Sequence, residues 1–157
     1  MDKIKILIVD DEHEFVETLS ERMKMRDQDS AFALNGEEAL KRIKDDIPDV
    51  VILDLKMPGI DGMEVLRRIR KAYPNVQVIM LTGHGSENDE KEARKLGAFD
   101  YLQKPVEMDK LMNRIRSAYK QKFEDKLTAA AFAECGEFDT AKEILDQEND
   151  KKKKKGK

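Results

Sequence analysis

Short apolar runs rich in β-branched residues recur along this chain, and each is followed by a segment with helical periodicity. The strong runs cover residues 4–9 (IKILIV), 50–53 (VVIL) and 76–81 (VQVIML), a weak run covers residues 31–34, and the last run covers residues 99–102 (FDYL). Because the strong runs are nearly continuous instead of alternating with polar residues, they are typical of strands buried on both faces of a sheet. This pattern favours folds in which a parallel sheet is covered on both sides.

Helical patterns fill the intervals, at residues 12–25, 37–44, 62–72, 87–96 and 107 to about 123. The first of them places four apolar side chains at the spacing of one helical face, namely Phe15, Val16, Leu19 and Met23. Strands that alternate with helices are joined by right-handed crossovers and therefore run parallel. We expect an α/β fold with a five-stranded parallel sheet, doubly wound, and helices on both faces.

Polar residues stand where four of the five predicted strands end. Asp10 and Asp11 follow the first strand, Asp54 follows the third, Thr82 follows the fourth, and Lys104 lies just beyond the fifth. In an open parallel sheet, ligands bind beyond the carboxyl ends of the strands, where the strand order reverses. We therefore expect these side chains to converge on one site.

The residue types at this edge predict a magnesium site that handles a phosphoryl group. Neighbouring carboxylates repel one another, and a divalent cation would relieve that repulsion. Oxygen ligands with room for water favour Mg²⁺, and the two histidines, His13 and His84, match no zinc spacing. The ammonium of Lys104 and the hydroxyl of Thr82 would bind phosphoryl oxygens, so Asp54 could act as a nucleophile that forms an acyl phosphate.

Each of these residues also has an ordinary structural interpretation. Asp10 and Asp11 could cap the helix that follows them, and Asp54 could simply end a strand. Thr82 or Lys104 taken alone carries no signal. The joint pattern outweighs these interpretations, because independent motifs rarely all fall into the predicted structural context.

Four motifs, ILIVDDE, VVILDLKMPGIDG, VIMLTGHGS and GAFDYLQKP, occur in this order within residues 3–121. They resemble the receiver domains of bacterial response regulators, the chemotaxis-regulator-like modules of two-component systems. The resemblance implies a flavodoxin-like fold and a phosphorylation-activated protein that accepts a phosphoryl group on Asp54. The donor would be a sensor histidine kinase or a phosphotransfer protein. The chain would catalyse only its own phosphotransfer and autodephosphorylation, and would not be an enzyme.

The resemblance also implies which residues hold the cation and the phosphoryl group. Asp11 and Asp54 would coordinate Mg²⁺ together with the backbone carbonyl of Lys56, and Asp10 would assist directly or through water. Lys104 would pair with the phosphoryl oxygens.

Four further roles follow from the same resemblance. Thr82 would turn to hydrogen-bond the phosphoryl group, and Tyr101 would move inward as Thr82 shifts. Without the resemblance, Tyr101 would be interpreted as a half-buried strand aromatic. Lys56 and His84 would flank the path of an attacking water and tune the lifetime of the acyl phosphate.

The resemblance ends near residue 121, which predicts three parts: a receiver domain at 1–121, a helical extension at 122–149, and a disordered lysine-rich tail at 150–157. The extension reads as a hairpin interrupted at Gly136. One hairpin cannot bury its own apolar face, so it would pack on the receiver, on a second copy in a homodimer, or on a partner. The second strand (RDQDSAFAL) and the charged fourth helix (SENDEKEARKLG) depart from the family pattern, which leaves the downstream protein open.

Composition limits the partners and the compartment. The net charge of −3 includes six lysines in the last seven residues, so the remainder is more acidic and direct DNA binding is not expected. No apolar run is long enough to span a bilayer, and the single cysteine, Cys135, fits a reducing cytoplasm.

Other functions remain as alternatives. The chain could be a phosphorylation-independent adaptor or dimerisation module, or the receiver fragment of a longer transcriptional regulator. A Mg²⁺-dependent phosphatase with an aspartyl nucleophile would want a second aspartate two residues after the nucleophile, where this chain has Lys56.

Overall fold

The computed structural model describes residues 3–134, with side chains as far as Asp125. Strands and helices alternate along the chain. The strands are β1 (Ile6–Val9), β2 (Ala31–Ala33), β3 (Val50–Leu53), β4 (Gln77–Thr82) and β5 (Asp100–Gln103). The helices are α1 (His13–Lys24), α2 (Gly36–Asp45), α3 (Gly62–Ala72), α4 (Glu87–Lys95) and α5 (Met108–Glu134).

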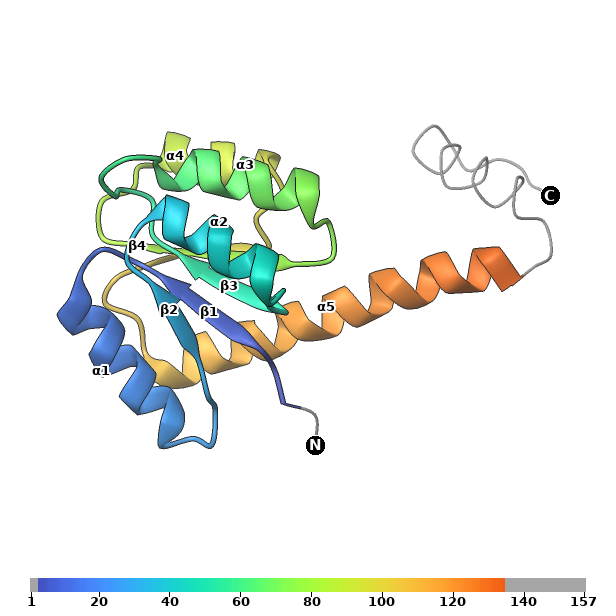
Figure 1. The fold of residues 1–157 in the computed structure, drawn as a ribbon, viewed down its shortest axis with the longest axis horizontal. Coiled ribbons are helices and arrows are strands. Elements are labelled where there is room, and N and C mark those ends of the chain that lie inside the picture. Colours follow the sequence, from blue (N-terminus) through green and yellow to red (C-terminus); the bar gives the residue numbers. More distant parts are fainter. Residues whose placement is uncertain (1–2, 135–157) are drawn as a thin grey trace. The chain divides into compact units, whose positions relative to one another are not determined.

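The five strands form one parallel sheet in the order β2-β1-β3-β4-β5 (Figure 1). The chain therefore moves outward from β1 to β2 and then returns to pair β3 with the other side of β1. This places the reversal of strand order between β1 and β3, the position where doubly wound sheets bind ligands. The predicted α/β fold with a doubly wound parallel sheet is confirmed.

Two apolar layers hold the helices against the sheet. On one face, alternate strand residues such as Leu7, Val51 and Met80 pack with buried residues of α2, α3 and α4. On the other face, their sequence neighbours Ile8 and Ile52 pack with α1 and the first turns of α5. Figure 1 shows the same division, with α1 and α5 on one side and α2, α3 and α4 on the other. Side chains of a strand point to opposite faces in turn, so both sides of each central strand must be apolar.

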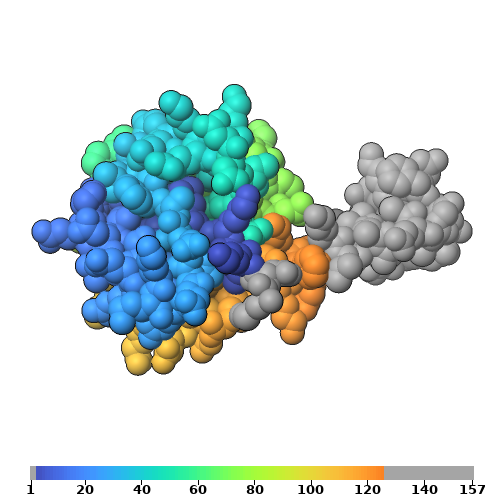
Figure 2. Space-filling model, turned by 60° about the horizontal axis from the view of Figure 1, so that its bottom comes forward, coloured from blue at the N-terminus to red at the C-terminus, as the bar shows by residue number. Residues whose placement is uncertain are grey.

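The second strand is shorter than predicted, with three residues in place of residues 31–34. It lies at the edge of the sheet, where Ala31 and Phe32 are exposed. The space-filling view shows α1 and β2 together on the surface, in blue (Figure 2). An edge strand has apolar neighbours on fewer sides, which explains why its sequence carries only a weak strand pattern.

Helix α5 is longer than predicted, because it continues to Glu134 instead of ending near Phe123. Residues 122–134 contain neither glycine nor proline, so nothing in the sequence interrupts the helix there. The structure divides into the units Met1–Lys122 and Phe123–Lys157, and the sheet belongs to the first. The second half of the predicted hairpin and the lysine-rich tail lie outside the described residues. In the part of the chain that is described, no helix is long and apolar enough to cross a membrane.

Candidate functional site

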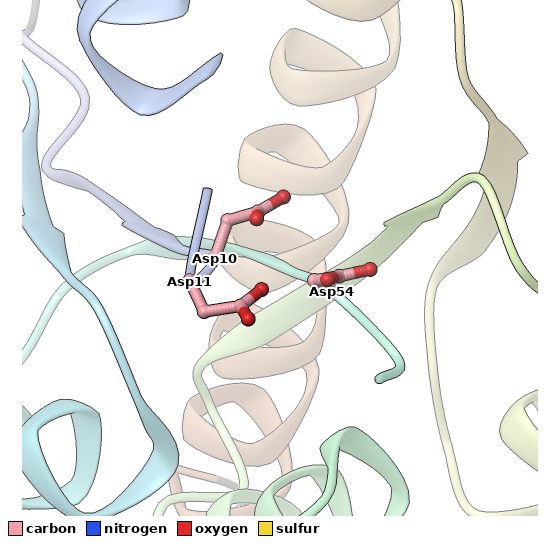
Figure 3. A group of neighbouring side chains, drawn as sticks. All are labelled: Asp10, Asp11 and Asp54. Atoms are coloured by element: carbon pink, nitrogen blue, oxygen red, sulfur yellow. The ribbon is translucent and has the colours of Figure 1, made fainter. Parts of the chain in front are cut away.

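Three carboxylates meet at the carboxyl ends of β1 and β3. Asp10 and Asp11 follow β1 and Asp54 follows β3, and one ligand oxygen from each lies within 4.8 Å of the others. Figure 3 shows the three side chains gathered over these strand ends. The backbone N–H of Asp54 donates to the carbonyl of Val9 over 2.9 Å, which continues the β1–β3 ladder into the site. The predicted convergence of these aspartates is therefore present.

Gly62, the first residue of α3, lies against the backbone that carries Asp54. A β-carbon on residue 62 would stand 2.2 Å from the carbonyl oxygen of Asp54 and 2.7 Å from Cα of Leu55. Only a glycine permits this approach, and the N–H of Gly62 uses it to donate to the carbonyl of Leu55 over 2.8 Å. Helix α3 thus fixes the position of the segment that follows β3.

The pKa of each of the two buried carboxylates is raised. Asp10 and Asp54 are 2% and 3% exposed. Burial, and next the nearby Asp10 carboxylate, raise the pKa of Asp54 against the opposing effect of Lys104. Burial likewise raises the pKa of Asp10, although its hydrogen bond with Lys104 acts the other way. One oxygen of Asp54, Oδ1, is buried and has no hydrogen-bond partner among the residues that the structure describes. A cation ligated by these oxygens would reduce the repulsion between the carboxylates and would give Oδ1 of Asp54 a partner.

Lys104 lies opposite the aspartates, in the segment after β5. Its Nζ is 2.6 Å from Oδ2 of Asp10 and 2.9 Å from Oε1 of Glu12, and it stands 4.0 Å from the centre of the Phe15 ring. Burial lowers the pKa of Lys104, but its hydrogen bonds with the two carboxylates outweigh burial and the pKa is raised. Lys104 is therefore a charged ammonium at neutral pH. The sequence predicted Lys104 at this edge, but not its pairing with Glu12.

Thr82 is the last residue of β4, and Tyr101 lies on the neighbouring strand β5. Thr82 is fully buried, and its Oγ1 accepts a hydrogen bond from the backbone N–H of His84 over 3.2 Å. Tyr101 packs in the same apolar cluster as Met80, and its buried hydroxyl has no hydrogen-bond partner in the described part of the chain. The ring is thus already inside the molecule, where the sequence interpretation places it only after Thr82 shifts.

The two residues predicted to tune the site, Lys56 and His84, are both exposed. Lys56 lies two residues after Asp54, and His84 lies two residues after Thr82. Their effect on lifetime, and the role of the Lys56 carbonyl as a ligand, stay predictions. A cavity of about 470 Å³ elsewhere in the molecule is lined by Lys5, Ser30 and Arg42 among others, none of which belongs to the carboxylate site.

Comparison with known proteins shows which family this chain belongs to. A family model described as the response regulator receiver domain matches residues 6–116. The chain belongs to the response regulator receiver family. Receivers of this family are signalling modules, and the known relatives of this chain include bacterial regulators.

Solved receiver structures match most of the described fold. A response regulator receiver domain protein from Clostridium thermocellum is 37% identical with a TM-score of 0.72, covering 76% of this chain and 96% of that one. A CheY-like receiver domain protein from Methanospirillum hungatei JF-1 is 25% identical with a TM-score of 0.75, covering 79% of this chain and 99% of that one.

A curated relative of the receiver is longer. The alkaline phosphatase synthesis transcriptional regulatory protein PhoP of Bacillus subtilis (strain 168) is 34% identical over 117 residues, which are 74% of this chain and 49% of that protein. The chain spans about half the length of the curated relatives it matches.

Proposed function

We propose that this receiver is a phosphorylation-activated switch of a two-component phosphorelay. It accepts a phosphoryl group on Asp54 from a histidine kinase or a phosphotransfer protein, and it signals through protein contacts. The observation that carries the proposal is the surroundings of Asp54: a buried carboxylate with an unpartnered oxygen, two further aspartates within 4.8 Å, and the Lys104 ammonium paired to one of them.

The carboxylate cluster fits Mg²⁺. Asp10, Asp11 and Asp54 offer only oxygen ligands, and Asp11 is exposed, so water has access to complete the coordination shell. The carbonyl of Lys56 is a further candidate ligand. Bound there, Mg²⁺ would neutralise charge on the phosphoryl oxygens.

The transfer itself requires little more than position and charge. A carboxylate oxygen of Asp54 attacks the phosphorus of the donor and forms a new O–P bond. The P–N bond to the donor histidine breaks, and its electron pair goes to the imidazole nitrogen. The ammonium of Lys104 and the hydroxyl of Thr82 bind the transferred oxygens, because both are hydrogen-bond donors at the edge of the same site.

Phosphorylation would then change the surface through Thr82 and Tyr101. The phosphoryl group adds negative charge and strong acceptor oxygens, which favour a turned Thr82 hydroxyl. The Tyr101 hydroxyl and the Thr82 methyl group both lie near Gly85, so the position of the Tyr101 ring would be coupled to that turn. The exposed His84 and Lys56 would govern how readily water reaches the acyl phosphate.

The test is the intact mass of the protein after incubation with Mg²⁺ and acetyl phosphate, beside an Asp54→Asn variant. We expect the wild-type protein to gain one phosphoryl group and the variant to gain none. No mass gain in either protein, under conditions where Mg²⁺ binding is measured, would instead favour a phosphorylation-independent adaptor.

A second candidate is the receiver part of a longer transcriptional regulator. The length of the curated relatives favours it, since this chain covers 49% of the protein named a transcriptional regulatory protein. An antibody against the receiver, applied to extracts of the source cells, distinguishes the two. A band well above 18.1 kDa supports the longer regulator, and a band at that mass supports a receiver that acts alone.

A further inference from the structure

Glu12 holds the ammonium of Lys104 but belongs to no part of the chemistry proposed above. Its Oε1 lies 2.9 Å from Nζ of Lys104. Glu12 is also the residue that precedes α1, yet its side chain makes no capping hydrogen bond with that helix. The carboxylate of Glu12 is therefore used for Lys104 and not for the helix terminus.

Three groups lie against the Lys104 ammonium: the carboxylates of Asp10 and Glu12 and the ring of Phe15. All three come from the segment that joins β1 to the first turn of α1. An ammonium has three N–H donors. The two carboxylates and the ring crowd the ammonium, so a phosphoryl oxygen on Asp54 that binds Lys104 competes with them.

Asp10 and Glu12 are unequal partners of Lys104. The Asp10 side chain is 2% exposed and belongs to the carboxylate cluster, whereas the Glu12 side chain is 59% exposed and lies outside that cluster. Release of Glu12 costs little, because water solvates its carboxylate as soon as the ion pair opens. Release of Asp10 would leave a buried carboxylate without its counter-ion, which is far more costly.

We infer that Glu12 is a positioning residue, a releasable counter-ion that holds Lys104 in the site and competes with the phosphoryl group for it. The inference rests on the proposed function and deepens it. Glu12 thereby lowers the occupancy of the phosphorylated state at a given donor concentration. Together with Asp10, it also keeps the long Lys104 side chain from extending into solvent when Asp54 is unmodified.

The test uses beryllofluoride with Mg²⁺, a non-covalent mimic of the phosphoryl group, and the variant Glu12→Gln. The substitution keeps the size of the side chain and removes its charge. We expect Glu12→Gln to bind beryllofluoride about two- to five-fold more tightly, the range that an exposed ion pair supports. The measurement is the fraction of backbone amide signals in the bound position, by NMR, as beryllofluoride is titrated.

The matched control is Glu14→Gln, which removes the same charge from the exposed first turn of the same helix. It should bind beryllofluoride as the wild type does, which separates the contact from the general electrostatic field. A second measurement follows the Cε signal of Lys104 with pH in the absence of beryllofluoride. Loss of the ion pair should lower the pKa of Lys104 in Glu12→Gln and leave it unchanged in Glu14→Gln.

Two results would overturn the inference while the proposed function stands. One is a Glu12→Gln variant that binds beryllofluoride no more tightly than Glu14→Gln, and the other is a variant that binds it more weakly. A wild-type protein that neither binds beryllofluoride nor gains a phosphoryl group would overturn the proposed function, and the inference with it. The two kinds of failure can be told apart, because the first two results are obtained only when the wild-type protein binds beryllofluoride.

Discussion

The hydroxyl oxygen of Tyr101 lies 1.4 Å from the point where a β-carbon on residue 85 would stand. The ring can occupy the interior only because residue 85 is glycine. The same point is 3.1 Å from Cγ2 of Thr82, so the loop after β4, the Thr82 side chain and the Tyr101 ring share one small space. The observed position of Tyr101 therefore depends on the glycine at residue 85.

Substitution of Gly85 by alanine should move Tyr101 to the surface. A methyl group cannot share the space of the hydroxyl, and the ring is the mobile partner because its far end makes the contact. We expect Gly85→Ala to raise the reactivity of Tyr101 toward tetranitromethane several-fold, measured by peptide mass after nitration.

Gly83→Ala is the control for this experiment, because a β-carbon there would make only ordinary contacts of 3.9 Å with the Lys104 side chain. Equal nitration of Tyr101 in both variants would mean that the loop, and not the ring, yields to the added methyl group.

Removal of the Tyr101 hydroxyl should stabilise the protein. Within residues 3–125 the buried hydroxyl has no hydrogen-bond partner, and such a group costs about 1–3 kcal/mol of folding free energy. We expect Tyr101→Phe to raise the free energy of unfolding by about 1 kcal/mol in urea denaturation. Tyr73→Phe, at a half-buried tyrosine that ends α3, is the matched control and should change little. A loss of stability in Tyr101→Phe would indicate that the hydroxyl is bonded in solution.

Neutralisation of Asp54 should also stabilise the fold. A carboxyl whose folded pKa is raised destabilises the protein while it is ionised, and that penalty disappears as the pH falls through the raised pKa. Asp54→Asn removes the charge at every pH, so we expect its free energy of unfolding at pH 7 to rise by about 1 kcal/mol. The difference from wild type should shrink in acid. Asp45→Asn, at an exposed aspartate of α2, is the control.

In the presence of magnesium, the wild type should become more stable than Asp54→Asn. A ligand that binds only the folded state adds about 2.7 kcal/mol at a concentration of 100 Kd. We expect Mg²⁺ to raise the unfolding midpoint of the wild type strongly and that of Asp54→Asn weakly, because the variant lacks one of three anionic ligands. An equal shift in both proteins would place the cation away from Asp54.

Asp100 should contribute stability that acid removes. Its carboxylate lies 3.0 Å from Nη2 of Arg94 and 2.5 Å from Nε of Arg114, which joins α4 and α5 to β5. Burial raises the pKa of Asp100, but hydrogen bonds from the Tyr101 N–H and the two arginines outweigh it, and the pKa is lowered. A lowered pKa means stability that is present above the ordinary value of 3.8 and is lost as the pH falls through the folded value.

We therefore expect Asp100→Asn to lower the free energy of unfolding at pH 7 by about 1–3 kcal/mol, and to lose less stability than the wild type between pH 5 and pH 2. Urea denaturation at a series of pH values measures both. Glu64→Gln is a suitable control, because Glu64 also pairs with two arginines, Arg67 and Arg68, but on an exposed helix face. Its effect should be smaller. The same loss in both variants would show that burial does not strengthen the Asp100 pairs.

The sequence predicts the parts of this protein that depend on chain order and periodicity. The strand β3 and the helix α3 have the predicted bounds, and the residues after β1, β3 and β5 meet because parallel strands end at one edge. Contacts between side chains follow no such rule. The pairing of Lys104 with Glu12 and the fit of Tyr101 against Gly85 arise from packing between segments far apart in the chain. In the sequence, Glu12 is marked only by its position as the third of three consecutive acidic residues.

The pairing of β1 with β3 has a consequence for how this site tolerates change. Val9 lies opposite Leu53 in that ladder, so Asp10 and Asp54 extend the same row. A slip of one residue would move Asp54 by about 3.3 Å and turn its side chain to the other face of the sheet. Insertions within these two strands should therefore abolish the chemistry even where the fold survives. Apart from positions such as Gly62, which touch the backbone of the site, the helices should tolerate change better than the alignment of this ladder.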